Sequence, residues 1–101
     1  MSLQMDGKVA VVTGATSGIG RASVLDFARH GVNVVAAGRR EERGAELVAE
    51  AQGLPGQVTF IRADVTVEED IQNLITNAVS EYGHIDYAFN NAGGARDIGR
   101  L

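Results

Sequence analysis

Four short apolar runs rich in β-branched residues alternate with three longer segments in which apolar residues recur at the helical period. Apolar runs of this kind predict strands buried on both faces, and repeated strand–helix–strand units require right-handed crossovers between parallel strands. The chain is therefore expected to be α/β, a doubly wound parallel sheet with helices on both faces. The expected strands are 8–12, 32–37, 58–61 and 85–89, and the expected helices are 19–30, 41–52 and 67–82.

Local signals place the ends of these elements. Gly31 and Gly83 are predicted to stop the first and third helices, and Thr66 with Glu69 has the spacing of a capping box at the start of the third. The crossover rule gives a strand order of 3-2-1-4. In such a sheet, ligands bind outside the carboxyl ends of the strands, where the order reverses.

The turn from the first strand to the first helix is rich in glycine and reads Thr-Gly-Ala-Thr-Ser-Gly-Ile-Gly over 13–20. We expect Gly14 to permit the sharp turn, Gly18 to lie beside a pyrophosphate, and Gly20 to let the helix pack tightly on the sheet. Free N–H groups at the helix N-terminus would attract the anion, although a plain structural turn is the alternative. The candidate cofactor-binding residues here are Gly14, Thr16, Ser17, Gly18, Ile19 and Gly20.

A second cluster, Gly38-Arg39-Arg40, follows the second strand about 20 residues beyond the loop. An acidic residue at this place would bind the 2′-hydroxyl of the adenosine ribose of NAD. Here a glycine precedes two guanidinium groups, which can receive a 2′-phosphate, so the pattern favours NADP over NAD. The alternative is a solvated pair of charges that opens a loop.

Two further clusters follow the third and fourth strands: Asp64-Val65, and the quartet Asn90-Asn91-Ala92-Gly93. An acidic residue can simply end a strand and enter a capped helix. Asparagine carries a donor and an acceptor, so it can hold two strands in register, while Ala92 and Gly93 leave room for a ribose beside the backbone.

The two glycine-containing motifs lie about 75 residues apart, and together they resemble the cofactor loop and the second signature of the short-chain dehydrogenase/reductase family. The resemblance implies that Asp64 accepts a hydrogen bond from the adenine amino group while Val65 packs on the ring. It also implies hydride transfer between a nicotinamide and a carbonyl or alcohol substrate, a homo-oligomer when intact, and a catalytic serine and Tyr-x-x-x-Lys pair beyond residue 101.

No catalytic residue can be assigned within the chain. Tyr82 and Tyr87 are not followed by lysine four residues on, and the only lysine, Lys8, precedes the first strand. Without a nearby cation a tyrosine is a poor general acid near neutral pH. We therefore interpret 1–101 as the N-terminal part of a Rossmann-type NAD(P)-binding domain that lacks its catalytic half. A non-catalytic dinucleotide-binding module, such as a sensor or an interaction domain, is the alternative.

Composition excludes several other classes. Nine basic and 13 acidic residues give a net charge of −4, which offers nothing to a nucleic-acid backbone. The absence of cysteine and the isolation of two histidines argue against a metal site. No apolar run approaches the ~20 residues that span a bilayer, and no signal-like N-terminus is present, so we expect no membrane partner and a cytoplasmic location.

Overall fold

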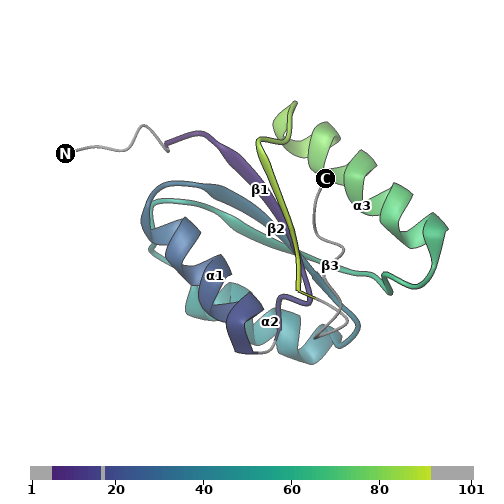
Figure 1. Cartoon of the computed structure of the whole chain (residues 1–101). Helices are drawn as coiled ribbons and strands as arrows, with labels where there is room; N and C mark the ends of the chain where they lie inside the picture. The colour runs from purple at the N-terminus through teal and green to yellow at the C-terminus, as the bar shows by residue number, and fades with distance from the viewer. Residues whose placement is uncertain (1–5, 17, 92–101) are drawn as a thin grey trace.

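The computed structural model describes residues 6–16 and 18–91, which form a parallel sheet with helices on both faces (Figure 1). Strand and helix alternate throughout, as the sequence predicts. The elements are β1 (Val9–Thr13), α1 (Gly18–Arg29), β2 (Asn33–Gly38), α2 (Glu41–Glu50), β3 (Val58–Arg62), α3 (Glu68–Tyr82) and β4 (Tyr87–Asn90).

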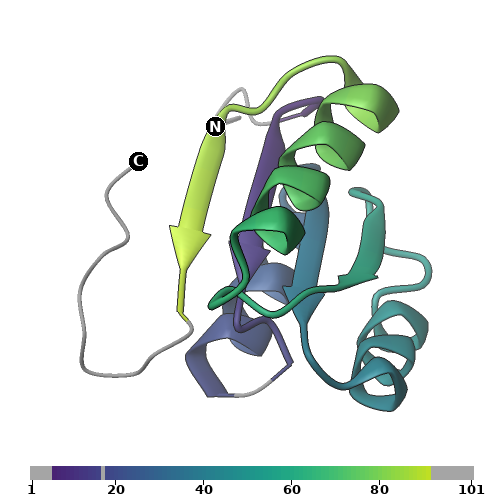
Figure 2. The ribbon, with the colours of Figure 1, turned by 90° about the vertical axis from the view of Figure 1, so that its right-hand side faces the viewer.

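The described strands lie in the order β3-β2-β1-β4 and all pair in parallel, which confirms the predicted topology. In β1, Val9 pairs with Asn33 of β2 and Ala10 with Tyr87 of β4. The central strand therefore has a neighbour on each side, and β3 and β4 form the two edges (Figure 2). The order reverses at β1, directly before the glycine-rich turn.

Alternate residues of the central strands face two separate cores. Helices α1 and α2 cover one face and α3 covers the other (Figures 1 and 2). The first core joins the sheet to side chains such as Val24 and Leu47, and the second joins it to Leu74 and Ala78. Because β1 and β2 are covered on both sides, their apolar runs show no polar alternation.

Glycines end two of the helices as predicted. Gly31 and Gly83 follow α1 and α3 with φ of +86° and +87°, the left-handed conformation that glycine adopts without strain. On α3, Ile71 and Val79 remain 39% and 44% exposed although they belong to the predicted apolar stripe. The side of the helix that packs on the sheet carries Leu74 and Ala78, which are buried, and Tyr82, which is partly buried.

The fourth strand starts two residues later than predicted, at Tyr87. Asp86 precedes the ladder and bonds to the start of β1 twice: its N–H donates to the carbonyl of Val9 at 2.8 Å, and its Oδ2 accepts from the Val9 N–H, also at 2.8 Å. The Asp86 side-chain oxygen thus takes the place of a backbone carbonyl in the ladder, so the regular pairing of β1 with β4 starts only at Ala10 and Tyr87.

Candidate functional site

The carboxyl ends of β1 and β4 are joined by side chains. Thr13 Oγ1 donates a hydrogen bond to Asn90 Oδ1 at 2.9 Å, and the Asn91 N–H donates to the Thr13 carbonyl at 3.2 Å. An asparagine of this quartet was expected to join two strands, and Asn90 does so through its hydrogen bond with Thr13. Thr13, which the site prediction did not include, is its partner, and only the register of β1 against β4 could have identified it.

Two backbone hydrogen bonds join the carboxyl ends of the other strands to the glycine loop and to one another. The Ala15 N–H donates to the Ala37 carbonyl at 3.0 Å, and the Ala63 N–H donates to the Gly38 carbonyl at 2.9 Å. The glycine loop is thereby tied to the end of β2, and the end of β2 to the segment after β3. The glycine loop, the arginines after β2 and the Asp64-Val65 pair thus lie at the same end of the sheet, where the strands have their carboxyl ends.

The glycine loop has the backbone geometry of a tight turn. Gly14 and Gly18 have φ of +62° and +53°. A Cβ built on Gly18 would meet no heavy atom within 4 Å, so no described side chain covers the backbone at that point. A phosphate can approach such a backbone closely. Ser17 lies outside the described residues.

Gly20 lies against the start of the glycine loop. A Cβ on Gly20 would overlap the carbonyl oxygen of Gly14 and lie 2.9 Å from its carbonyl carbon, so this glycine lets α1 approach the chain directly after β1. Beside it, the side chain of Ile19 is 77% exposed. An apolar side chain this open at the edge of a site offers a surface to a ligand.

Thr16 reaches from the loop to the end of β2. A Cβ on Gly38 would lie 3.2 Å from Thr16 Cγ2 and 3.3 Å from its Oγ1, so the threonine fills the space that a side chain at position 38 would need. Arg39 and Arg40 follow with exposed side chains, and within the described residues neither forms an ion pair. Among the described residues, two arginines without an ion-pair partner thus directly follow Gly38, the residue that Thr16 of the loop contacts.

Asp64 organises the turn from β3 into α3. Its Oδ1 accepts hydrogen bonds from the Thr66 N–H at 2.9 Å and from Thr66 Oγ1 at 2.6 Å. The predicted capping box is wrong, because α3 begins at Glu68 with Val67 as its N-cap and no side chain caps it. The Thr66 hydroxyl instead donates a charge-assisted hydrogen bond to the Asp64 carboxylate, within the turn that precedes the helix. Val65 lies half-buried in the same turn.

Hydrogen bonds from Thr66, first from its hydroxyl and then from its N–H, hold the pKa of the Asp64 carboxyl below its ordinary value of 3.8. Partial burial opposes this effect, while the charges of Arg39 and Arg62 add to it. The carboxylate is thus ionised throughout the neutral range. Because the folded-state pKa is the lower one, Asp64 stabilises the fold above pH 3.8, and this contribution is lost as the pH falls through the folded value.

Replacing Thr66 with valine should raise the pKa of Asp64 toward 3.8, because the substitution removes the largest of the causes that lower it. The measurement is an NMR titration of the Asp64 carboxyl carbon. Thr59→Val is the matched control, since Thr59 Oγ1 contacts the Tyr82 hydroxyl at 3.3 Å and not Asp64. An unchanged titration of Asp64 in Thr66→Val would refute this account of the turn.

Asn91 supplies a further polar group at this edge. Its side-chain nitrogen is buried and has no hydrogen-bond partner within the described part of the chain. A buried donor without a partner costs free energy unless a ligand satisfies it. Together with the bare backbone at Gly18, this donor fits a bound nucleotide. Ala92 and Gly93, the other predicted residues of this cluster, lie outside the described residues.

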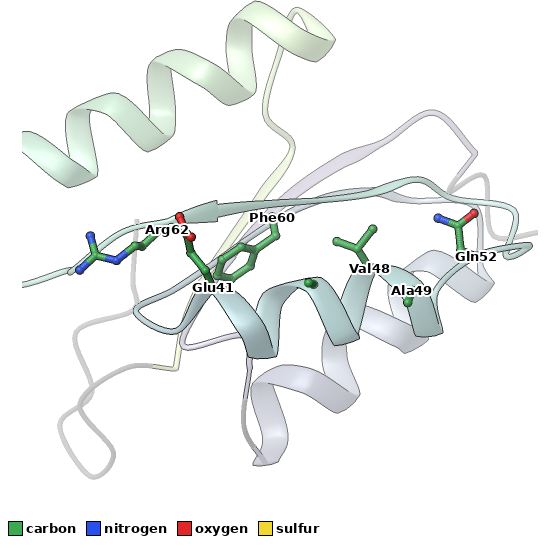
Figure 3. A pocket seen from close by; sticks show the side chains of 7 residues that line it. Glu41, Val48, Ala49, Gln52, Phe60 and Arg62 are labelled. Carbon is green, nitrogen blue, oxygen red and sulfur yellow. The ribbon is translucent and has the colours of Figure 1, made fainter.

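A pocket of about 580 Å³ lies elsewhere, between α2 and β3 (Figure 3). Phe60 and Val48 line its middle, with Glu41 and Arg62 at one end and Gln52 at the other. None of the predicted cofactor-binding residues lines it. The predicted site therefore lies at the carboxyl ends of the strands, beside the glycine loop, and not in this pocket.

Neither tyrosine is placed for proton transfer. Tyr82 is held beside Thr59, and the ring of Tyr87 stacks on Phe27 at 6.2 Å between centroids. In the segments 6–16 and 18–91, no three histidine, cysteine or acidic residues gather as metal ligands, and no helix is long and apolar enough to cross a bilayer. Among the described residues, the groups at this end of the sheet that suit a ligand are backbone N–H donors and arginines, whose chemistry favours an anion.

A parallel sheet that carries a glycine-rich loop at the point where its order reverses defines the doubly wound, nucleotide-binding class of α/β proteins. A family model described as short chain dehydrogenase matches residues 8–100. The chain belongs to the short-chain dehydrogenase family.

Individual relatives agree with this assignment. The chain is 43% identical over 95 residues to the 3-oxoacyl-[acyl-carrier-protein] reductase FabG of Thermotoga maritima, covering 94% of the chain and 39% of that protein. The hydroxysteroid dehydrogenase structure from Escherichia coli superimposes with a TM-score of 0.85 at 39% identity, over 92% of the chain and 38% of that structure. A short chain dehydrogenase/reductase from Burkholderia phymatum in complex with NAD gives a TM-score of 0.79 at 35% identity, over 86% and 31% respectively. The chain thus spans less than two-fifths of these relatives.

Proposed function

We propose that residues 1–101 are the N-terminal, cofactor-binding part of an NADP-preferring short-chain dehydrogenase/reductase. The named relatives are reductases or dehydrogenases more than twice as long, which supports assigning the catalytic half to a segment beyond this sequence. The proposed cofactor-binding residues are Gly14, Thr16, Ser17, Gly18, Ile19, Gly20, Arg39, Arg40, Asp64, Val65, Asn91, Ala92 and Gly93.

The proposed preference for NADP rests on the residues at the end of β2. No carboxylate stands at Gly38 to bind a ribose 2′-hydroxyl or to repel a phosphate, and the adjoining Arg39 has no ion-pair partner among the described residues. Arginine binds phosphate through several charge-assisted hydrogen bonds. One structural relative is in complex with NAD, so the fold alone does not decide between the two cofactors.

When bound, the nicotinamide supplies hydride chemistry for a carbonyl or alcohol substrate. The described residues do other work: the N-terminus of α1 binds the pyrophosphate, Arg39 the 2′-phosphate, and Asp64 and Val65 the adenine. Proton transfer falls to a serine and a Tyr-x-x-x-Lys pair beyond residue 101. Consistent with that division, Tyr82 and Tyr87 are occupied in packing and side-chain contacts.

The family relationship also supports a homo-oligomer for the intact protein. The lack of cysteine is compatible with the reducing conditions of the cytoplasm, which we propose as its compartment.

Equilibrium titration of the intact protein with NADPH and NADH tests the proposal. The expected result is a Kd for NADPH lower by roughly 10- to 100-fold, the worth of one charge-assisted contact, together with hydride transfer to a carbonyl substrate. The 101-residue chain alone should show no turnover. Nucleotide binding by the intact protein without any turnover would instead favour a non-catalytic binding module, and no binding of either nucleotide would refute the proposal.

A further inference from the structure

The turn that presents Asp64 is fixed by a second carboxylate that lies outside the predicted site. Asp70, in the first turn of α3, accepts a hydrogen bond at its Oδ2 from the backbone N–H of Asp64 at 2.9 Å. The Asp64 carbonyl in turn accepts from the N–H of Val67 at 2.9 Å. The peptide groups on both sides of Asp64 are therefore restrained, one by a charged side chain and one by the turn.

The carboxylate of Asp64 is also oriented. Both hydrogen bonds from Thr66 end on Oδ1, and within the described residues no hydrogen bond ends on Oδ2. One oxygen thus holds the turn together while the other can accept from an amino group. The direction in which Oδ2 points depends on the backbone of Asp64, which Asp70 restrains.

We propose that Asp70 is a positioning residue for adenine recognition: it holds the backbone of Asp64 so that Oδ2 meets the 6-amino group of the cofactor. This inference rests on the proposed function, because it requires that a dinucleotide lies at this edge of the sheet. Asp70 is assigned no contact with the cofactor. Its effect is on the discrimination between purines, because a misdirected acceptor loses the amino contact while the ring still packs on Val65.

The chain contains a matched control for this role. Glu69 lies in the same turn of α3 and carries the same charge near the positive end of the helix, but its side chain is exposed. If acidic residues act here only through the helix dipole, removing Glu69 and removing Asp70 will have the same consequence. If Asp70 acts through the N–H of Asp64, only its own removal will change how the base is recognised.

The experiment compares the Kd of NADPH with that of its purine analogue, in which a hydrogen atom replaces the 6-amino group. This analogue offers no donor at C6, so the intact wild-type protein should prefer adenine by roughly 10-fold or more. Asp70→Ala should bring this preference close to unity. Asp70→Asn, which keeps an acceptor, should retain most of it, and Glu69→Ala should retain all of it.

Other outcomes overturn the inference. A wild-type preference that survives in Asp70→Ala, or equal losses in Asp70→Ala and Glu69→Ala, shows that Asp70 only stabilises the helix. A wild-type protein that binds both analogues equally has no adenine contact for Asp70 to position. If Asp70→Ala does not fold, Asp70→Ser is measured in its place, because serine is tolerated in a first helical turn but is too short to reach the Asp64 N–H. Failure of the wild type to bind either nucleotide refutes the proposed function itself, a result distinct from a lost preference.

Discussion

Substituting Gly20 with alanine is expected to weaken the binding of NADPH by the intact protein by more than about 100-fold, the worth of losing two or more charge-assisted phosphate contacts. A methyl group there overlaps the Gly14 carbonyl, and Gly14 is already in the left-handed conformation. The loop has little room to yield, because the Ala15 N–H is bonded to the Ala37 carbonyl at 3.0 Å. Either α1 moves away or the turn distorts, and both displace the N–H groups that we propose bind the phosphate.

The matched control for this substitution is Gly56→Ala. A Cβ on Gly56 would overlap the carbonyl oxygen of Val32, a clash of the same kind at the amino ends of the strands. Both variants should lose about 1–3 kcal/mol of stability through overpacking, but only Gly20→Ala should lose nucleotide affinity. Isothermal titration of the folded proteins measures the difference. Equal affinity losses in the two variants would show that the effect reflects stability and not the loop.

Replacing Arg39 with alanine should weaken the binding of NADPH by roughly 10- to 100-fold and leave that of NADH almost unchanged, since one charge-assisted hydrogen-bonding partner is worth ~1.5–3 kcal/mol. The reason is that only NADPH carries the 2′-phosphate. Arg39 also lies near enough to Asp64 to lower the pKa of its carboxyl, so it bridges the regions assigned to the phosphate and to the adenine.

Arg43→Ala is the control for this variant, because Arg43 is an exposed arginine in the first turn of α2. It should leave both affinities unchanged. Equal losses for NADPH and NADH in Arg39→Ala would identify Arg39 as a structural residue. A loss in Arg43→Ala as large as that in Arg39→Ala would mean that general positive charge, and not a contact, sets the preference.

Much of the fold could be predicted because its determinants are local. Buried strands appear as apolar runs, and a glycine such as Gly31 marks a helix end through its backbone conformation alone. Parallel pairing and strand order then follow from the crossover rule. Local sequence was less informative where neighbouring polar residues can form more than one set of hydrogen bonds. The Thr66 hydroxyl was expected to cap α3, but the Asp64 carboxylate binds it instead.

The site was predictable as a set of clusters but not as a network. Glycines and arginines at strand ends indicate a nucleotide because of their chemistry. Nothing in the spacing indicates that Thr13 meets Asn90, 77 residues away, or that Asp70 reaches back to Asp64. Such contacts depend on strand register and on the angle at which a helix leaves the sheet. For the same reason, Gly20 was identified as a site residue while its actual contact, Gly14, was missed.

A crystal structure of the intact protein with NADP would test the proposed cofactor site. We expect the pyrophosphate to lie at the N-terminus of α1 beside Gly18, and the 2′-phosphate to lie within hydrogen-bonding distance of the Arg39 guanidinium. We also expect Asp64 Oδ2 to face the adenine amino group. A nucleotide bound in the pocket between α2 and β3, or a 2′-phosphate remote from Arg39, would contradict the proposed function.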